Sequence, residues 1–241
     1  MSDKQNVFAA ILAGGSGTRM GNPEKPKQYL MLGSKPIIVH TIEKFCASNS
    51  FDAVLVLCPA AWVQQTRDII KRYAPECGNS VVVIPGGGTR NDTVRDAVSY
   101  LCENYEVNEE TVLVTHDAVR PFVSHRIIRE NIQAARECGA CDTVIPATDT
   151  IVQSDDGEFI AEIPNRISLY QGQTPQSFNL LQLKDLMESL THEEEVILTD
   201  ACKIFVLRGK KVALVRGDVA NMKITYPQDM RVASALIGGG S

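Results

Sequence analysis

The sequence lacks the glycine loops of the two most familiar nucleotide-binding folds. No Gly-x-x-x-x-Gly-Lys-Ser/Thr string occurs in its 241 residues, which excludes a Walker-type P-loop. A dinucleotide fingerprint that starts at Gly15 and Gly17 needs a third small residue at position 20, where this chain has Met20. No acidic residue ends the next apolar strand either. These absences argue against a P-loop kinase and against an NAD-dependent enzyme.

Other features are scarce as well. No apolar stretch is long enough to cross a bilayer, and the polar N-terminus shows no signal peptide. The net charge of −5 argues against a general nucleic-acid binder. Seven scattered cysteines fit a reducing compartment, so we expect a cytoplasmic protein. The four histidines have no metal-ligand spacing, and the lone Cys-x-x-Cys at 138–141 is a weak zinc signal.

Apolar strand-like runs alternate with amphipathic helical ones along most of the chain. The predicted strands are Val7–Leu12, Ala53–Cys58, Val81–Ile84, Thr111–Thr115, Thr143–Pro146 and Lys211–Val215. The predicted helices are Pro36–Cys46, Ala60–Tyr73, Arg90–Glu103, His125–Cys138, Leu180–Ser189, Thr199–Leu207 and a last one from Pro227 to about Leu236. This order predicts an α/β fold with a mostly parallel sheet and helices on both faces. We expect one domain over residues 1–237, with 238–241 as a flexible tail or a cloning remnant.

The alternation breaks near residue 147. Residues 148–163 are typical of two short strands around Asp156-Gly157, because Asp-Gly between alternating runs is a strong hairpin signal. An isolated hairpin is marginal in water. The hairpin must therefore pack on its own domain or reach a partner subunit as an arm, and the residues favour neither alternative.

The loop at residues 12–28, directly after the first predicted strand, is the most informative segment. It combines several glycines with the cations Arg19, Lys25 and Lys27. Glycine lets backbone N–H groups approach a phosphate closely, and the cations add positive charge at the same place. The loop predicts a nucleoside-triphosphate site at the carboxyl end of the strand. The alternative, a tight turn with incidental basic residues, leaves several cations without a partner.

Three later segments could converge on this loop. The glycine run at 85–93 could lay bare backbone against a base, or it could be a flexible turn in which Asn91 or Asp92 caps the next helix. Asp117 ends a strand and would face the triphosphate, which favours a Mg²⁺ ligand, although it could instead cap a turn or pair with Arg120. Lys223 precedes the last helix, and its surroundings alone assign it no function.

These segments also carry a resemblance that spans nearly the whole chain. The matching strings are residues 13–20, 26–29, 86–93, 116–121, 173–176, 199–200 and 222–225. In this order they resemble the cytidylyltransferase family that includes the methylerythritol-phosphate and ribitol-5-phosphate enzymes. The resemblance implies a Rossmann-like nucleotide-diphospho-sugar transferase fold. It also implies a homodimer in which residues 147–170 form the dimerisation arm.

The resemblance further implies roles for individual residues. Arg19, Lys27 and Lys223 match catalytic cations around the triphosphate and the reacting phosphorus. The CTP-binding positions are Leu12, Ala13, Gly14, Gly15, Gly17, Gly87 and Thr93. Asp117 matches the Mg²⁺ ligand and, with Arg120, contacts substrate. The remaining substrate positions are Thr150 and Arg166, which would reach the neighbouring subunit from the arm, and Thr174 and Thr199.

The implied reaction joins CTP and a polyol phosphate to give a CDP-polyol and pyrophosphate by in-line displacement. The attacking phosphate oxygen is already anionic, so no general base is needed. Strings at 163–166, 169–176 and 198–205 look more like the ribitol-5-phosphate branch, and Ala201 replaces an acidic residue of the methylerythritol branch. We therefore expect D-ribitol 5-phosphate, serving wall or capsule polymers, with methylerythritol 4-phosphate of isoprenoid synthesis as the alternative.

Two other kinds of protein agree less well with these residues. A non-catalytic nucleotide-binding relative would be expected to lose one of the charged positions, yet Arg19, Lys27, Asp117 and Lys223 are all present. An enzyme for sugar 1-phosphates would share the first glycine loop but not the strings at 173–176 and 222–225.

Overall fold

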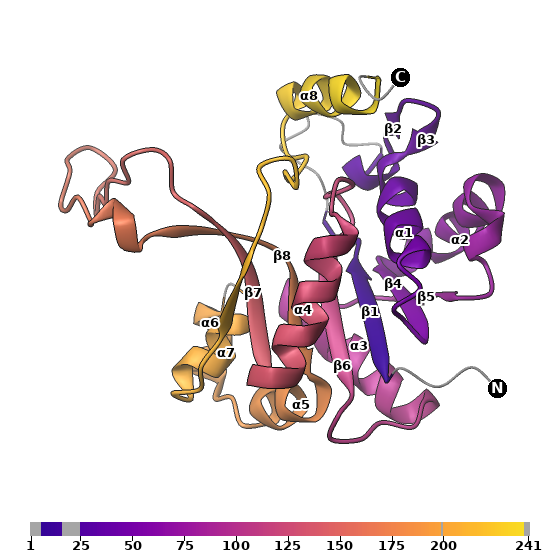
Figure 1. Cartoon of the computed structure of the whole chain (residues 1–241), viewed down its shortest axis with the longest axis horizontal. Helices are drawn as coiled ribbons and strands as arrows, with labels where there is room; N and C mark the ends of the chain where they lie inside the picture. The colour runs from indigo at the N-terminus through magenta and orange to yellow at the C-terminus, as the bar shows by residue number, and fades with distance from the viewer. Residues whose placement is uncertain (1–5, 16–24, 199, 239–241) are drawn as a thin grey trace.

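The computed structural model describes residues 6–15, 25–198 and 200–238, which form a central sheet covered by helices (Figure 1). The strands of the main sheet, in spatial order, are β5 (Val81–Pro85), β4 (Ala53–Cys58), β1 (Val7–Leu12), β6 (Val112–Asp117), β8 (Tyr170–Asn179), β7 (Ala140–Pro146) and β9 (Ala213–Arg216). The pairs β5/β4, β4/β1, β1/β6 and β7/β9 are parallel, whereas β8 runs antiparallel to both neighbours. The mostly parallel sheet predicted from the alternation is confirmed.

Helices cover both faces of the sheet, as predicted. On one face lie α1 (Ile37–Ala47), α2 (Val63–Tyr73) and α4 (His125–Cys138). On the other lie α3 (Arg90–Asn104), α5 (Leu180–Glu188) and α7 (Cys202–Leu207). The strands β4 and β6 are buried throughout, because their two faces are covered by different helices.

Helix ends follow ordinary capping chemistry. Thr89 and Asp92 form a reciprocal capping box at the start of α3. Ser124 caps α4, which ends at Gly139 in the left-handed conformation, with φ at +82°. Pro36 precedes α1 as its N-cap instead of forming the first helical residue.

The strand β8 is absent from our sequence-based assignment. Its central residues are polar yet buried, including Thr174, Gln176 and Ser177. Thr174 and Ser177 have partners in distant elements, as when Ser177 donates to Asn131 of α4 at 3.2 Å. A strand that buries polar groups in this way shows no apolar alternation. The short helix α6 (His192–Ile197) also went unpredicted, and α7 begins at Cys202, later than expected.

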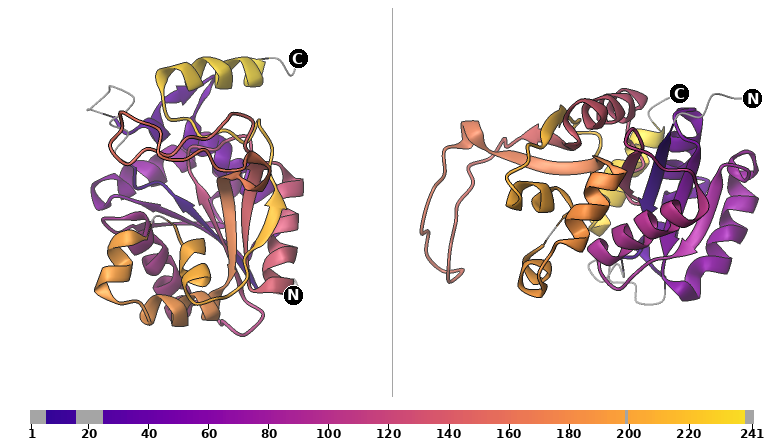
Figure 2. Two further views of the ribbon diagram at one scale, coloured as in Figure 1. Left: turned by 90° about the vertical axis from the view of Figure 1, so that its left-hand side faces the viewer. Right: turned by 90° about the horizontal axis from the view of Figure 1, so that it is seen from below.

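Between β7 and β8 the chain leaves the body of the molecule and returns, forming the projecting arm seen in Figures 1 and 2. The two strands predicted here are reduced to one isolated bridge between Gln153 and Glu162 in the described arm. The Asp-Gly turn itself is present, with Gly157 at φ +80°.

The C-terminal helix α8 (Pro227–Gly238) lies beside the small hairpin of β2 (Met31–Leu32) and β3 (Lys35–Pro36) (Figure 1). Ala233 of α8 packs in an apolar cluster with Leu32, Val119 and Ile224. Among the helices that the structure describes, none combines the length and apolar character of a bilayer-spanning segment.

Candidate functional site

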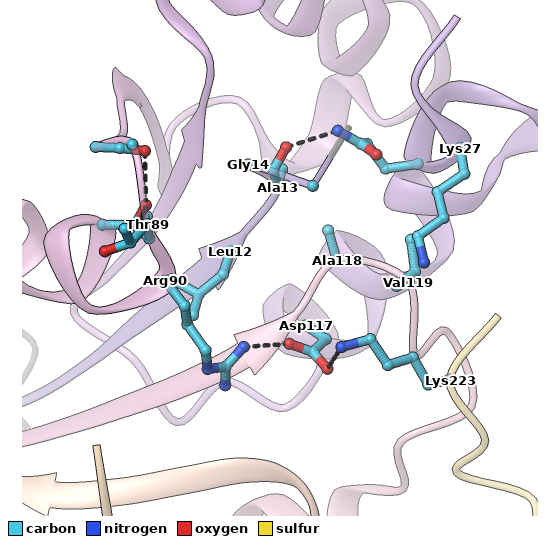
Figure 3. Close-up of a pocket in the computed structure, with 15 residues that line it drawn as sticks. Leu12, Ala13, Gly14, Lys27, Thr89, Arg90, Asp117, Ala118, Val119 and Lys223 are labelled. Carbon is cyan, nitrogen blue, oxygen red and sulfur yellow. Dashed lines mark hydrogen bonds and ion pairs between the residues drawn. The ribbon is translucent and has the colours of Figure 1, made fainter. Parts of the chain in front are cut away.

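A cavity of about 410 Å³ opens at the carboxyl ends of β1 and β6 (Figure 3). It is lined by Leu12, Ala13, Gly14, Gly15, Lys27, Gln28, Gly87, Gly88, Thr89, Arg90, Thr93, Asp117, Ala118, Val119 and Lys223. The two strands are paired up to Leu12 and Asp117, so the carboxyl end of the parallel part of the sheet forms its floor. This is the edge at which α/β sheets bind ligands.

The first glycine loop is fastened to the sheet at its start. The amide of Ala13 donates to the carbonyl of Leu57 at 2.7 Å, and the side chain of Gln28 donates to the carbonyl of Ala13 at 2.6 Å. Gly14 and Gly15 remain exposed to the cavity. The backbone of Gly14 and Gly15 is therefore available to a ligand without unpairing the strand.

The second glycine run packs against the start of α3. A Cβ atom on Gly87 would lie 2.3 Å from Cβ of Asp92, so no other residue fits at this position. Asp92 caps the helix together with Thr89, as one of our two alternatives predicted. Thr93 follows, with its hydroxyl donating to the carbonyl of Thr89 at 2.8 Å.

Lys27 enters the cavity from a short 3₁₀ helix, Lys27–Tyr29, and only 7% of it is exposed. The helix is anchored by Tyr29, whose ring stacks on Trp62 with centroids 4.7 Å apart. The phenol of Tyr29 also lies 2.7 Å from the hydroxyl of Thr66. This packing fixes the base of the lysine side chain.

Asp117 is the charged centre of the site. Its Oδ1 lies 2.5 Å from Nη1 of Arg90, and its Oδ2 lies 3.0 Å from Nζ of Lys223 (Figure 3). The same Oδ2 lies 3.3 Å from Nε of Arg120. Burial opposes ionisation of this carboxyl, but Arg90, Lys223 and Arg120 hold its pKa well below its usual range. The site therefore contains an ionised carboxylate with three cations gathered around it.

Two buried side chains, Thr174 and His116, fix the position of Asp117. Its amide donates to the hydroxyl of Thr174 at 3.1 Å, and that hydroxyl lies 2.9 Å from Nδ1 of His116. Nε2 of His116 is 3.1 Å from the carbonyl of Arg120. Burial lowers the pKa of His116 to about 4, so the imidazole is neutral and the chain of hydrogen bonds is complete.

Many of the residues singled out in the sequence meet in this cavity. They are Leu12, Ala13, Gly14, Gly15, Lys27, Gly87, Thr93, Asp117 and Lys223. Arg120 lies behind Asp117, with its Nη1 donating to the carbonyl of Asn221 at 2.8 Å. Thr174 holds the backbone of Asp117, as described above. Thr150 and Arg166 lie on the projecting arm, where Arg166 donates to the carbonyl of Thr148 at 2.8 Å. Gly17, Arg19 and Thr199 lie outside the described residues.

Arg90 was not among our predicted site residues. It is the first residue of α3, and an arginine there is typical of a solvated helix end. Its position directly after the glycine run, at the carboxyl end of β5, was the available signal.

Comparison with known proteins identifies the group of enzymes to which this site belongs. The family described as "IspD: 2-C-methyl-D-erythritol 4-phosphate cytidylyltransferase" matches residues 7–238. The chain belongs to this family.

Two kinds of relative bear on the cytidylyltransferase site. A ribitol-5-phosphate cytidylyltransferase of Lactiplantibacillus plantarum is 52% identical over 231 residues, covering 96% of this chain and 98% of the relative. Among solved structures, a 4-diphosphocytidyl-2C-methyl-D-erythritol synthase from Anaerococcus prevotii has a TM-score of 0.78 at 26% identity, covering 96% of both chains. The Francisella tularensis 2-C-methyl-D-erythritol 4-phosphate cytidylyltransferase has a TM-score of 0.77 at 25% identity, covering 95% of this chain and 98% of its own. The nucleotidyltransferase fold predicted from the sequence is therefore confirmed.

Proposed function

We propose that this protein transfers CMP from CTP to D-ribitol 5-phosphate, giving CDP-ribitol and pyrophosphate. The observation that carries the proposal is the set of cations, Arg90, Lys223 and the buried Lys27, arranged in one glycine-lined cavity around Asp117. The 52% identity to a ribitol-5-phosphate cytidylyltransferase supports the choice of acceptor.

The reaction needs positioning and positive charge more than proton transfer. A phosphate oxygen of the acceptor attacks the α-phosphorus of CTP, and the bond from that phosphorus to the bridging oxygen of pyrophosphate breaks. No residue has to remove a proton, because the attacking oxygen is ionised. Lys27, Lys223 and Arg90 would hold the reacting phosphates together and stabilise the charge that develops in the transition state.

Asp117 gives Arg90 and Lys223 fixed positions before any substrate is present. Without the carboxylate, Arg90, Arg120 and Lys223 would repel one another. Arg90 and Lys223 remain partly exposed, at 27% and 40% of their side-chain areas, so they are accessible to phosphate oxygens. We infer that preorganisation of this kind is the main contribution of the carboxylate.

Mg²⁺ on Asp117 is part of the proposal. The described residues contain no cluster of three or more His, Cys, Asp or Glu side chains suited to a metal ion. A single carboxylate fits Mg²⁺ only in the manner usual for nucleotide sites, where phosphate oxygens and water complete the coordination. Because both oxygens of Asp117 are paired with cations, the ion would have to replace Arg90 or Lys223 at one of them. When bound there, the ion would neutralise charge on the triphosphate.

The projecting arm supports a homodimer. Ile163, Ile167 and Phe159 of the arm expose 58%, 86% and 73% of their surface. Apolar side chains gathered on one segment mark an interaction surface. We infer that the arm packs on a second copy of the chain and brings Thr150 and Arg166 toward that copy's active site.

The acceptor is tested by pyrophosphate release from CTP and Mg²⁺, with ribitol 5-phosphate compared directly with methylerythritol 4-phosphate. We expect the larger kcat/KM with ribitol 5-phosphate. Lys27→Ala should abolish release with either acceptor, and Lys184→Ala, on the exposed face of α5, should leave it unchanged. A larger kcat/KM with methylerythritol 4-phosphate would reverse the assignment of the acceptor, and no release with either would refute it.

A further inference from the structure

A second polar cluster lies on β7 and β8, next to β6 in the sheet, and the proposed mechanism does not use it. Asp142 of β7 and Gln176 of β8 are directly paired in the sheet. Nε2 of Gln176 donates to Oδ1 of Asp142 at 3.1 Å. This hydrogen bond fixes the orientation of the amide, since the reverse orientation would set two acceptor oxygens against each other.

The remaining oxygen of this amide has no donor. Gln176 is only 3% exposed, yet its Oε1 accepts no hydrogen bond from any residue that the structure describes. A buried acceptor without a donor is costly, by about 1–3 kcal/mol. Asn91 shows the same feature, because its amide nitrogen donates to Leu198 and its buried Oδ1 accepts from none of the described residues.

The cluster faces the same side of the sheet as Asp117. Cys141 and Thr143 both contact Asn131 of α4, so the intervening Asp142 points to the opposite face. Asp117 lies on that face too, where it meets Arg90 of α3. In the sheet, Gln176 is level with Thr115, two residues before Asp117, and one strand spacing of about 4.8 Å separates the strands.

The cluster is negatively charged, and of its two members Asp142 is the partly exposed one. Asp142 is half-buried and lies beside the exposed Gly172, where an added Cβ would be 3.5 Å from Oδ2 of Asp142. Burial raises the pKa of Asp142 to about 6, the hydrogen bond from Gln176 opposes this, and Asp200 adds to the rise. A phosphate group would be repelled here, whereas a hydroxyl group could donate to each free acceptor.

We propose that Asp142 and Gln176 form the subsite that binds the hydroxyl groups of the acceptor polyol, with its phosphate directed toward Arg90 and Lys223. The ligand class is an open-chain polyol phosphate, whose successive hydroxyls would donate to the partly exposed carboxylate of Asp142 and to the amide oxygen of Gln176, which accepts from none of the described residues. This inference rests on the proposed function, and it makes Asp142 a residue that selects the acceptor without touching CTP.

The test is Asp142→Asn in the full-length protein, assayed at saturating CTP. We expect kcat/KM for ribitol 5-phosphate to fall by roughly 10- to 100-fold, mainly through KM, as for loss of a hydrogen bond to a charged group. The KM for CTP and the inhibition constant of methyl phosphate, which carries no polyol hydroxyls, should stay within about twofold of the wild-type values, because neither depends on the subsite.

Asp68→Asn is the matched control. Asp68 also accepts from a glutamine amide, that of Gln64 at 3.0 Å, but it lies exposed on α2. Should Asp142→Asn unfold, Gly172→Val provides a second variant. It places a side chain against Oδ2 of Asp142 and should raise the KM for ribitol 5-phosphate.

Each result decides between the two proposals. Unchanged ribitol 5-phosphate kinetics in a folded Asp142→Asn or Gly172→Val variant, with an active wild type, would overturn the subsite alone. A parallel rise in the KM for CTP would assign the cluster a structural role and also overturn it. A wild type that does not turn over ribitol 5-phosphate would refute the proposed function, and the subsite with it.

Discussion

Nζ of Lys223 lies 3.0 Å from Oδ2 of Asp117, a contact that joins the segment after β9 to the carboxyl end of β6. The lysine is thus held at the cavity by Asp117, whose amide donates to Thr174 and whose carboxylate pairs with Arg120. A surface lysine would sample many rotamers, whereas this one is confined before substrate arrives.

We predict that Lys223→Ala lowers kcat for pyrophosphate release by about 10²- to 10³-fold, as expected when one preorganised charge donor is removed. The free energy of unfolding should change little, because 40% of the side chain is exposed. Steady-state kinetics and urea unfolding measure the two quantities. Near-normal turnover would contradict the assignment, and Lys223→Arg serves as the charge-preserving comparison.

We predict that Thr174→Val destabilises the protein by about 1–3 kcal/mol and lowers kcat. The substitution removes the hydroxyl that accepts from the amide of Asp117 and contacts His116, leaving buried polar groups unpaired. Thr174→Ser keeps the hydroxyl and should restore most of both quantities. If Thr174→Val instead raised only the KM for the polyol phosphate, with unchanged stability, Thr174 would act as a substrate contact.

We predict that Ile167→Asp converts a dimer to a monomer, because it places a charge on a side chain that is 86% exposed on the arm. Sedimentation velocity measures the change. Val232→Asp on α8, where the side chain is 51% exposed, is the control for an apolar residue outside the arm. A wild-type protein that sediments as a monomer at assay concentration would contradict the inferred role of the arm.

We predict a pH dependence of stability that comes from Asp142. Its pKa is raised to about 6 in the folded protein, above the value of about 3.9 for an unperturbed aspartate. Its contribution to stability is therefore fully present below about pH 4 and is lost as the pH rises through about 6. The difference in unfolding free energy between wild type and Asp142→Asn should decrease over that range, as followed by urea unfolding. A difference in unfolding free energy that does not change with pH would contradict this prediction.

The predictable parts of the fold are the strands and helices that bury apolar side chains. The strands β1 and β4 were predicted at their observed bounds, because Val7–Leu12 and Ala53–Cys58 are unbroken apolar runs. The helix α4 was also predicted at its observed bounds, His125–Cys138. The strand β8 was not, since its buried groups are amides and hydroxyls whose partners lie far away in the sequence.

The site residues also differ in whether the local sequence reveals them. The loop after β1 carries its own chemical signature, so Lys27 and the glycines were found from local residues. Lys223 was found through resemblance, because a lysine in a short extended segment has no local feature that marks it. Arg90 had one local signal, its position after the glycine run. Asp142 depends on the register between β7 and β8, and no pattern along the chain contains that information.

The late position of Lys223 in the chain affects when the enzyme becomes competent during synthesis. All strands of the main sheet, up to Arg216 of β9, are made before Lys223. Ile224, next to that lysine, joins Leu32 and Val119 in a cluster that Ala233 of α8 completes. A nascent chain can thus form its sheet and its glycine loops while its charge set is still incomplete. Packing of the segment after β9 against Asp117, rather than folding of the sheet, would then be the step that completes the site.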